Sequence, residues 1–337
     1  MVITLLASSA SFAQLGGQSA YTFLNTPIAP RVAGTAGAVV ANTETDVNFG
    51  IWNPALINSN MHGHMSLSFA SLSGGVRFGE GVYSHTWKKA GSFNAGIKYV
   101  NYGDFKSTNN LAVVTGSFSA SDFAFQVGYG YQLDSNFQVG ASVKLINSAY
   151  EQYSSWAIAT DIAAVYQIPR SRFAMALILR NMGTQIQKFN SEGEALPFEV
   201  KFGVSTRFKH VPLRLNLMLD NLQQMDLTYN DPNNVSTDPI TGQVTVQEES
   251  VANKILRHVV IAAELTPGKR FNLQLGYSFR RNFEMAIPTR RSSAGLTFGA
   301  GLKISKFFLN YANTNMNVAG RMHHFSITTS LGDFKKN

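Results

Sequence analysis

The chain has 337 residues, 45% of them hydrophobic, with 14% charged residues, 12% aromatics, 28 glycines and a formal net charge of +8. This composition suits strands that face lipid better than a charged soluble surface, and the scattered basic residues argue against nucleic-acid binding. No apolar run reaches the roughly 18 residues of a membrane helix, so a membrane-spanning form of this chain would cross as strands.

The amino terminus is typical of a signal peptide. An apolar stretch over residues 1–6 is followed by Ser11-Phe12-Ala13, which puts small residues at the two positions that signal peptidase inspects. We therefore expect export, with residues 1–13 as a signal peptide; a buried first strand is the alternative. The Lys or Arg expected before the apolar stretch is missing, which predicts a true start further upstream. The absence of cysteine fits passage through an oxidising periplasm.

Residues 14–62 precede the first predicted strand and mix turn-forming with apolar residues. The polar faces of the later strands carry many glycines, and a bare inner wall leaves room for other backbone. We therefore expect this segment to fold inside a barrel as a plug; a loose periplasmic tail is the alternative. The glycines concerned are Gly96, Gly128, Gly130, Gly140, Gly203, Gly276, Gly299 and Gly301.

Residues 63–337 repeat an alternation of apolar and polar side chains. Between Asp122 and Gln132 every second residue is Phe, Val or Tyr, which predicts a strand with one apolar and one polar face. Stretches of about ten residues suit an inclined strand that crosses a bilayer. The apolar faces cover residues 65–69, 76–87, 93–99, 123–131, 137–145, 156–166, 173–179, 198–208, 213–219, 259–265, 271–279, 296–304, 307–311 and 325–331. The predicted fold is all-β: a transmembrane antiparallel β-barrel of fourteen strands with an N-terminal plug.

The polar faces of these strands are predicted to line the lumen. A Lys or Arg at mid-membrane costs about 2 to 4 kcal/mol, and none of the apolar faces carries a charge. The charged residues predicted to face the lumen are Lys98, Lys144, Glu199, Lys201, Arg207, Arg214, Arg280 and Lys303.

Connection lengths predict the orientation of the barrel. Links after even-numbered strands are brief, such as residues 134–136 and 209–212, whereas links after odd-numbered strands are mostly long, such as 104–121 and 221–256. Outer-membrane barrels have tight periplasmic turns and longer outer loops. We therefore expect loops at the cell surface and both termini in the periplasm.

The longest outer link, residues 221–256, is the leading candidate for contact with a partner. Long loops on a rigid scaffold commonly carry binding; disorder is the competing interpretation. The residues predicted to bind a partner are Asp226, Asn230, Asp231, Asp238, Glu248 and Glu249.

Catalytic and metal-binding patterns are not found in the sequence. His62 and His64, and the neighbours His323 and His324, do not offer converging ligands with a carboxylate at a helpful spacing. There is no Gly-x-Ser-x-Gly turn, no phosphate-binding glycine-rich loop and no His-Glu-x-x-His. We expect a non-enzymatic protein without a cofactor.

Several short phrases resemble one family closely. They are Gly16-Gly17-Gln18, Tyr21-Thr22-Phe23-Leu24-Asn25, Asn53-Pro54-Ala55-Leu56, the stretch from Tyr99 to Phe105, the stretch from Gly116 to Asp122, Arg180-Asn181-Met182-Gly183, Leu196-Pro197-Phe198 and Asn310-Tyr311-Ala312. Together they look like the PorQ family, outer-membrane components of the type IX secretion system of the Bacteroidetes. That family is similar to PorV and to a wider FadL-like group of fourteen-stranded barrels with an amino-terminal hatch.

The resemblance implies a role as an anchor. The barrel would hold a PorZ-like surface protein, together with PorU and PorV, in a complex that joins secreted cargo to lipopolysaccharide at the outer membrane. The alternative is a FadL-type transporter of hydrophobic small molecules such as fatty acids, which should have an apolar pocket continuous with the lumen. Polar, glycine-rich inward faces favour the anchor, and a soluble exported β-sandwich is a third interpretation.

Overall fold

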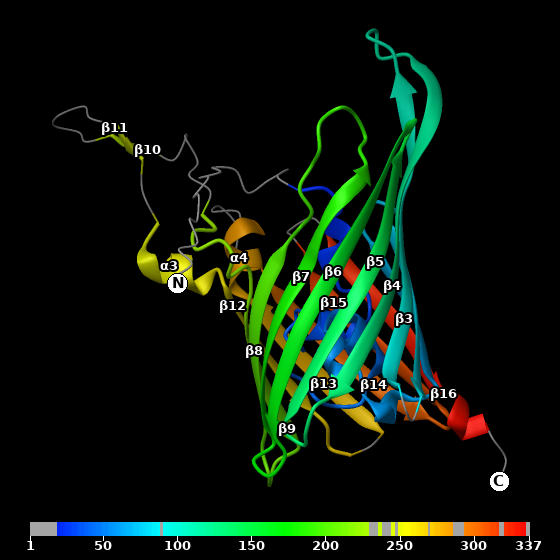
Figure 1. Ribbon diagram of the computed structural model, residues 1–337. Helices are drawn as coiled ribbons and strands as arrows, with labels where there is room; N and C mark the ends of the chain where they lie inside the picture. The colour runs from blue at the N-terminus through cyan, green and yellow to red at the C-terminus, as the bar shows by residue number, and fades with distance from the viewer. Residues whose placement is uncertain are drawn as a thin grey trace, which may run out of the picture.

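Fourteen strands form one closed barrel in the computed structural model of this chain (Figure 1), which confirms the predicted fold class. The structure describes residues 19–87, 90–228, 235–237, 244–246, 249–268, 270–285, 293–316 and 320–334. The barrel strands are β1 (His64–Leu72), β2 (Arg77–Trp87), β3 (Gly91–Thr108), β4 (Val114–Gln132), β5 (Phe137–Tyr150), β6 (Tyr153–Ile168), β7 (Phe173–Gln187), β8 (Glu199–Arg207), β9 (Leu213–Leu219), β12 (Val259–Leu265), β13 (Phe271–Ser278), β14 (Leu296–Ile304), β15 (Phe307–Asn315) and β16 (Arg321–Ser330). Neighbouring strands are antiparallel, and β1 closes on β16 with His64 opposite Ser330.

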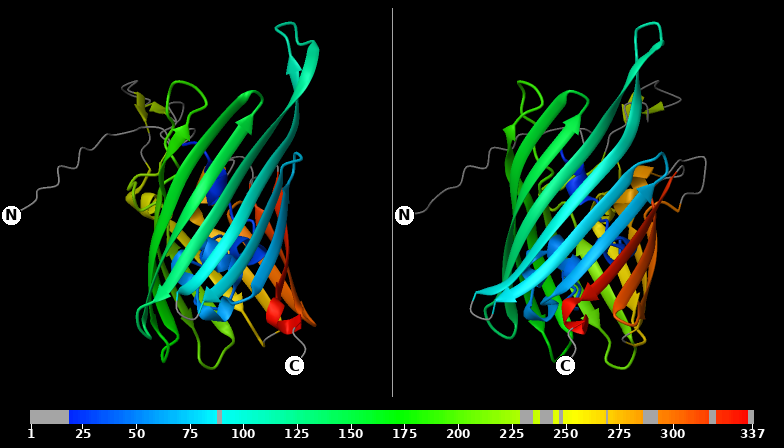
Figure 2. Two further views of the ribbon diagram at one scale, coloured as in Figure 1. Left: turned by 45° about the vertical axis from the view of Figure 1, so that its right-hand side comes forward. Right: turned by 90° about the vertical axis from the view of Figure 1, so that its right-hand side faces the viewer.

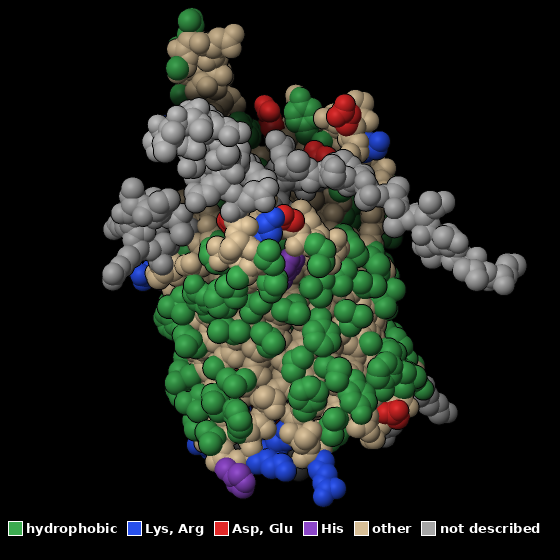
Figure 3. Space-filling view, turned by 90° about the vertical axis from the view of Figure 1, so that its left-hand side faces the viewer, with side chains coloured by type: hydrophobic (Ala, Val, Ile, Leu, Met, Phe, Trp, Pro, Cys, Tyr) green, Lys and Arg blue, Asp and Glu red, His purple; other side chains and the backbone are tan. Residues whose placement is uncertain are grey.

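The two faces of the strands separate apolar from charged side chains. Leu67, Ile162 and Leu275 are exposed on the outside, whereas Lys144 and Glu264 are buried inside. Apolar side chains cover the barrel wall in a broad band, and charged groups gather at its two ends (Figure 3). Because an apolar outer surface of this extent requires lipid around it, the closed barrel excludes a soluble β-sandwich. No helix within the described ranges is long and apolar enough to cross a membrane.

One end of the barrel carries short turns and the 3-10 helix η4 (Leu331–Phe334), and the other carries the longer connections. We call these the short-turn end and the long-loop end. The predicted loop over residues 104–121 is largely strand, because β3 and β4 continue as a paired hairpin from Asp104 opposite Ser119 to Thr108 opposite Val114. This β3–β4 hairpin, residues 104–119, projects beyond the barrel (Figure 2). It was predicted as a loop because both its faces meet solvent, so selection for one apolar face is lost.

Two short helices and a separate hairpin lie at the long-loop end, and one of these helices corrects the predicted position of Arg280. The helices α3 (Val251–Leu256) and α4 (Phe279–Met285) lie there, with the separate hairpin of β10 (Val235–Thr237) and β11 (Val244–Val246). Strand β13 therefore ends at Ser278, and Arg280 lies on a helix instead of the inward face of a strand.

Residues 19–62, which we call the hatch, lie inside the barrel. The hatch contains η1 (Thr22–Asn25), α1 (Pro30–Gly34), α2 (Val47–Trp52), η2 (Pro54–Leu56) and η3 (Ser59–Met61). Most of its side chains are buried against the inner wall. Phe23, Ile28, Val39 and Phe49 are nearly inaccessible, and the hatch shares an apolar core with inward-facing wall residues such as Ile178.

The hatch runs through the lumen from one end to the other. Ser19 forms a bridge with Ala195 in the β7–β8 connection at the long-loop end, whereas the His62 ring accepts a hydrogen bond from Thr86 near the short-turn end of β2. The described chain therefore begins at the end opposite to η4. The amino terminus itself, expected on the same side as the carboxy terminus, lies outside the described residues. Strand parity determines where β1 starts, but a segment long enough to thread the lumen can approach that point from either side. The predicted signal peptide lies outside the described residues.

Candidate functional site

The first junction between the hatch and the barrel wall is a network of ion pairs around Arg31. This residue is on α1, and its guanidinium donates to Glu264 of β12, with Nη2 2.9 Å and Nε 3.1 Å from Oε2. It also pairs with Glu44 and with Asp46 at 3.5 Å, both in the hatch. Its guanidinium carbon lies 4.9 Å from the centre of the Phe49 ring. Arg31 and Glu264 are both buried, so their hydrogen bonds offset the cost of removing two charges from water.

Glu44 extends this network to two more strands. Its Oε1 lies 3.2 Å from Arg207 on β8 and 3.3 Å from Arg214 on β9. Burial by itself raises the pKa of Glu44, but the positive charges of Arg31 and Arg214 outweigh it and lower the pKa to about 2. Glu44 therefore stays ionised at neutral pH and joins the hatch to the wall.

A second junction brings together three of the phrases that carry the family resemblance. The Asn181 side chain donates to Asn25 Oδ1 at 2.8 Å and to the Pro197 carbonyl at 3.0 Å. Asn25 also donates to the Pro197 carbonyl at 3.3 Å. Tyr21 pairs with Ser155 and accepts from Gln185 at 3.3 Å. Phrases far apart in sequence therefore form one hydrogen-bonded cluster between hatch and wall.

A β-bulge in β7 makes this second junction possible. Asn181 has φ 56°, and the pairing of β6 with β7 shifts between Thr160 and Ile162. Asn tolerates the left-handed region better than most residues. The bulge turns both Arg180 and Asn181 inward, where the backbone N–H of Asn181 donates to Asp161 Oδ1 at 2.8 Å.

Glycines on the inner wall let the hatch backbone approach closely. A Cβ atom on Gly140 of β5 would lie 2.3 Å from the Pro54 carbonyl, and one on Gly130 of β4 would lie 2.2 Å from the Ile57 carbonyl oxygen. These distances are too short for any real side chain. Glycine on the inner wall therefore leaves room for the hatch backbone next to η2, as predicted.

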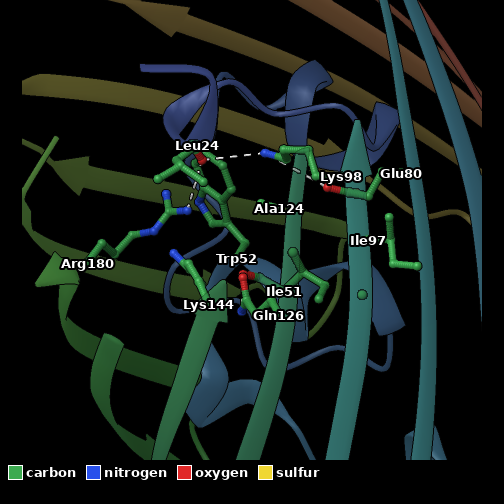
Figure 4. A pocket seen from close by; sticks show the side chains of 11 residues that line it. Leu24, Ile51, Trp52, Glu80, Ile97, Lys98, Ala124, Gln126, Lys144 and Arg180 are labelled. Carbon is green, nitrogen blue, oxygen red and sulfur yellow. Dashed lines mark hydrogen bonds and ion pairs between the residues drawn. The ribbon is translucent and has the colours of Figure 1, made fainter. Parts of the chain in front are cut away.

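The spaces left among the described residues are small or open to solvent. An enclosed cavity of about 20 Å³ lies between Leu24, Trp52, Lys98 and Arg180 (Figure 4). A second space of about 130 Å³ lies beneath α4. A third, of about 650 Å³, opens toward the short turns and carries charged groups from the first junction, the barrel rim and η4. None of these three spaces is an apolar passage through the barrel.

The structure places the predicted lumen residues in three settings. Lys98, Lys144, Glu199, Lys201 and Arg214 are buried in the lumen. Arg207 is partly exposed, in the ion network of Glu44. Arg280 is on α4, 3.9 Å from Asp220, and Lys303 lies at the short-turn rim, 3.9 Å from Asp333.

Only part of the predicted partner loop lies within the described residues. Asp226 pairs with Lys254 of α3 at 2.8 Å, and hydrogen bonds from Lys254 and Thr228 lower the pKa of Asp226 to about 2. Glu249 accepts from Arg257 at 3.1 Å. Both carboxylates therefore hold α3 in place. Asn230, Asp231, Asp238 and Glu248 lie outside the described residues.

Sequence reasoning missed several residues at the two junctions. Arg31, Asn25 and Arg180 were not predicted as site residues, although each contacts a partner far away in sequence. One signal was available for Arg180: the alternation of β7 breaks immediately after Leu179, where two polar residues follow each other. No comparable signal marks Arg31, because the hatch has no regular period.

A closed fourteen-stranded barrel with an apolar outer band and an internal N-terminal hatch is an integral outer-membrane β-barrel. No protein-family model matches the chain, and no curated protein matches it in sequence. Among solved structures it is similar to the Ralstonia pickettii toluene transporter TbuX, with TM-score 0.54, 12% identity, and coverage of 90% of this chain and 98% of that one. A Pseudomonas aeruginosa FadL homologue gives TM-score 0.49 at 11% identity and coverage of 90% and 99%. At such identities the likeness concerns the fold alone.

Proposed function

We propose that this barrel is a sealed scaffold that anchors a surface protein in the attachment complex of a type IX secretion system. The observation that carries the proposal is the tightly packed hatch, joined to the wall by two polar junctions. The spaces beside Leu24 and beneath α4 measure about 20 and 130 Å³, whereas small-molecule sites usually measure about 300 to 1,000 Å³. The space of about 650 Å³ at the short-turn end is open to solvent and is lined by many charged side chains. The proposed role is non-enzymatic, and the long-loop end would face the cell surface, because outer loops are longer than periplasmic turns.

The β3–β4 hairpin is the feature best suited to hold the partner. Its two outer edges are unpaired beyond Asn101 of β3 and Ser119 of β4, so they can accept an added strand. Phe105 stacks on Phe118, with ring centres 5.3 Å apart, and Leu111 at the tip is 82% exposed. A lone two-stranded hairpin is marginally stable in water. We infer that a PorZ-like surface protein adds a strand to this hairpin and covers its apolar tip.

The partner loop would provide a second contact, through Asp226, Asn230, Asp231, Asp238, Glu248 and Glu249. Lipopolysaccharide, PorU and PorV would complete the surroundings of the barrel. These assignments rest on the resemblance described above and on the position of α3 at the long-loop end, next to the described parts of this loop.

Charging the hairpin tip tests the anchor. We expect Leu111→Asp with Val113→Asp to reduce partner recovery from purified outer membranes at least about tenfold, since a buried charge without a partner costs several kcal/mol. The matched control is Leu133→Asp with Val211→Asp at the short-turn end, where the exposures of 55% and 51% resemble the 56% of Val113. Heat-modifiable migration on a gel shows whether each barrel is folded. Equal recovery from both variants, or recovery of the barrel alone from the wild type, would contradict the anchor.

The second candidate is a transporter of hydrophobic small molecules, and the comparisons favour it over the anchor. TbuX and the Pseudomonas putida protein TodX, which shares 13% identity at TM-score 0.49 over 85% of this chain and 92% of its own, are both described as toluene transporters. What supports the candidate here is the shared barrel and hatch. In this role the hatch would have to move, because the enclosed spaces are too small for such a ligand.

A disulfide between hatch and wall separates the two candidates. The chain has no cysteine, and a Cβ on Gly203 of β8 would lie 3.1 Å from the Cβ of Val40 in the hatch, slightly closer than a disulfide needs. We expect the Val40→Cys, Gly203→Cys variant to capture the partner equally well with its disulfide oxidised or reduced. We also expect toluene uptake to be the same in cells with and without the barrel. Uptake that stops on oxidation and returns on reduction would establish the transporter instead, and each single-cysteine variant is the control.

A further inference from the structure

The small cavity of Figure 4 lies where the hatch meets five strands. Leu24 of η1 and Trp52 of α2 form its hatch side, and side chains of β2, β3, β4, β5 and β7 form its wall side. Its volume of about 20 Å³ is enough for one water-sized particle. Any occupant must therefore be close to water in size, such as a monatomic ion.

The charges around the cavity do not balance. Three cationic side chains line it, Lys98, Lys144 and Arg180, and all three are buried. Asp161 accepts from Lys144 at 2.7 Å, and Glu80 lies 4.0 Å from Lys98. One positive charge is therefore left without a close carboxylate.

The uncompensated charge belongs to Arg180, which is only 2% exposed. Its Nη2 donates to the Leu24 carbonyl at 3.4 Å, and its guanidinium carbon lies 4.1 Å from the centre of a Trp52 ring. Its Nε and Nη1 have no hydrogen-bond partner among the described residues. The neighbouring Glu199 is paired with Lys201 at 2.8 Å. A buried guanidinium with two free donors is costly unless an acceptor with negative charge is close.

We propose that this cavity binds one small monovalent anion, of which chloride is the test case. The anion would accept from Arg180 and lie near the Lys98 and Lys144 ammonium groups, which already donate to the Thr26 carbonyl at 2.9 Å and to Asn181 at 2.7 Å. The volume excludes a phosphate or an organic carboxylate, and a water molecule would leave the positive charge uncompensated. Because Leu24 and Trp52 belong to the hatch and the cations belong to the wall, the bound anion holds the two together. This inference does not depend on either candidate function.

The test uses the full chain in detergent and needs two readouts. Crystals grown in bromide should show an anomalous peak in the cavity, next to Arg180. In solution, protease cleavage within the hatch should be about tenfold faster in gluconate than in chloride at equal ionic strength, as expected for chloride at about ten times its dissociation constant. Gluconate is too large for the cavity.

Two arginine variants show whether Arg180 is responsible. Arg180→Met should remove the difference between chloride and gluconate. Arg214→Met is the matched control, because Arg214 is another buried lumen arginine but already pairs with Glu44 at 3.3 Å and donates to Ser205 at 2.9 Å. It should retain the chloride effect. If Arg180→Met does not fold, the wild-type bromide peak decides. A wild type without a bromide peak, or with equal cleavage in both salts, overturns the proposal.

Discussion

Gly140→Val is expected to displace the hatch while leaving the barrel closed. The Cβ of the new side chain would lie 2.3 Å from the Pro54 carbonyl, and backbone at η2 cannot rotate away as a side chain could. Overpacking of this kind costs about 1 to 3 kcal/mol, which corresponds to roughly 5- to 150-fold in an equilibrium constant. Protease cleavage within the hatch should accelerate by that factor, and heat-modifiable migration should show an intact barrel.

Gly79→Val is the matched control for this experiment. Gly79 is on β2, and a Cβ atom there would have no neighbour within 4 Å. The same substitution at this position should leave hatch cleavage unchanged. Equal cleavage rates for the two variants would show that η2 does not depend on the bare wall of β5.

Arg31→Met is expected to destabilise the closed hatch more than any other single substitution considered for this chain. It leaves Glu264, which is fully buried, without its ionic partner. Breaking a buried ion pair from one side costs about 3 to 5 kcal/mol. The apparent melting temperature of the hatch in detergent and its protease resistance should both fall. Adding Glu264→Leu to Arg31→Met should recover part of the loss, because the uncompensated charge is removed.

The exposed pair of Lys254 and Asp226 provides the comparison. Their side chains are 30% and 52% exposed, and Lys254→Met should cost no more than about 1 kcal/mol. If Arg31→Met proves equally mild, the ion network does not hold the hatch.

Acid offers an independent check of this network. Because the pKa of Glu44 is lowered, the stabilising effect of its charge is complete above the ordinary pKa of 4.5 and is lost as the pH falls toward 2. The difference in hatch stability between wild type and Glu44→Gln should therefore disappear over that range.

The alternation of side chains predicted the barrel well because lipid on one face of each strand selects apolar side chains at those positions. Along β5, Ala141, Val143 and Leu145 face outward while Ser142 and Lys144 face the lumen, so Lys144 could be placed inside without knowledge of its partners. The same rule failed where a strand leaves the bilayer, as in the β3–β4 hairpin, and where a strand ends early, as at Arg280.

The alternation of side chains could not predict the two junctions, because their residues meet only after the barrel has closed around the hatch. Asn25, Asn181 and Pro197 each belong to a phrase of the family resemblance, yet nothing local shows that they converge. The course of the hatch through the lumen was likewise not predicted, because strand parity says nothing about a segment that threads the lumen.

The amino-acid sequence by itself determined the strand number, the apolar outer band and the inward position of most charged strand residues, because lipid and water act on each residue separately. Only the tertiary structure decided what fills that lumen and how it is held. Arg31 and Glu264 are 233 positions apart, and a contact over such a separation depends on the course of the whole chain between them.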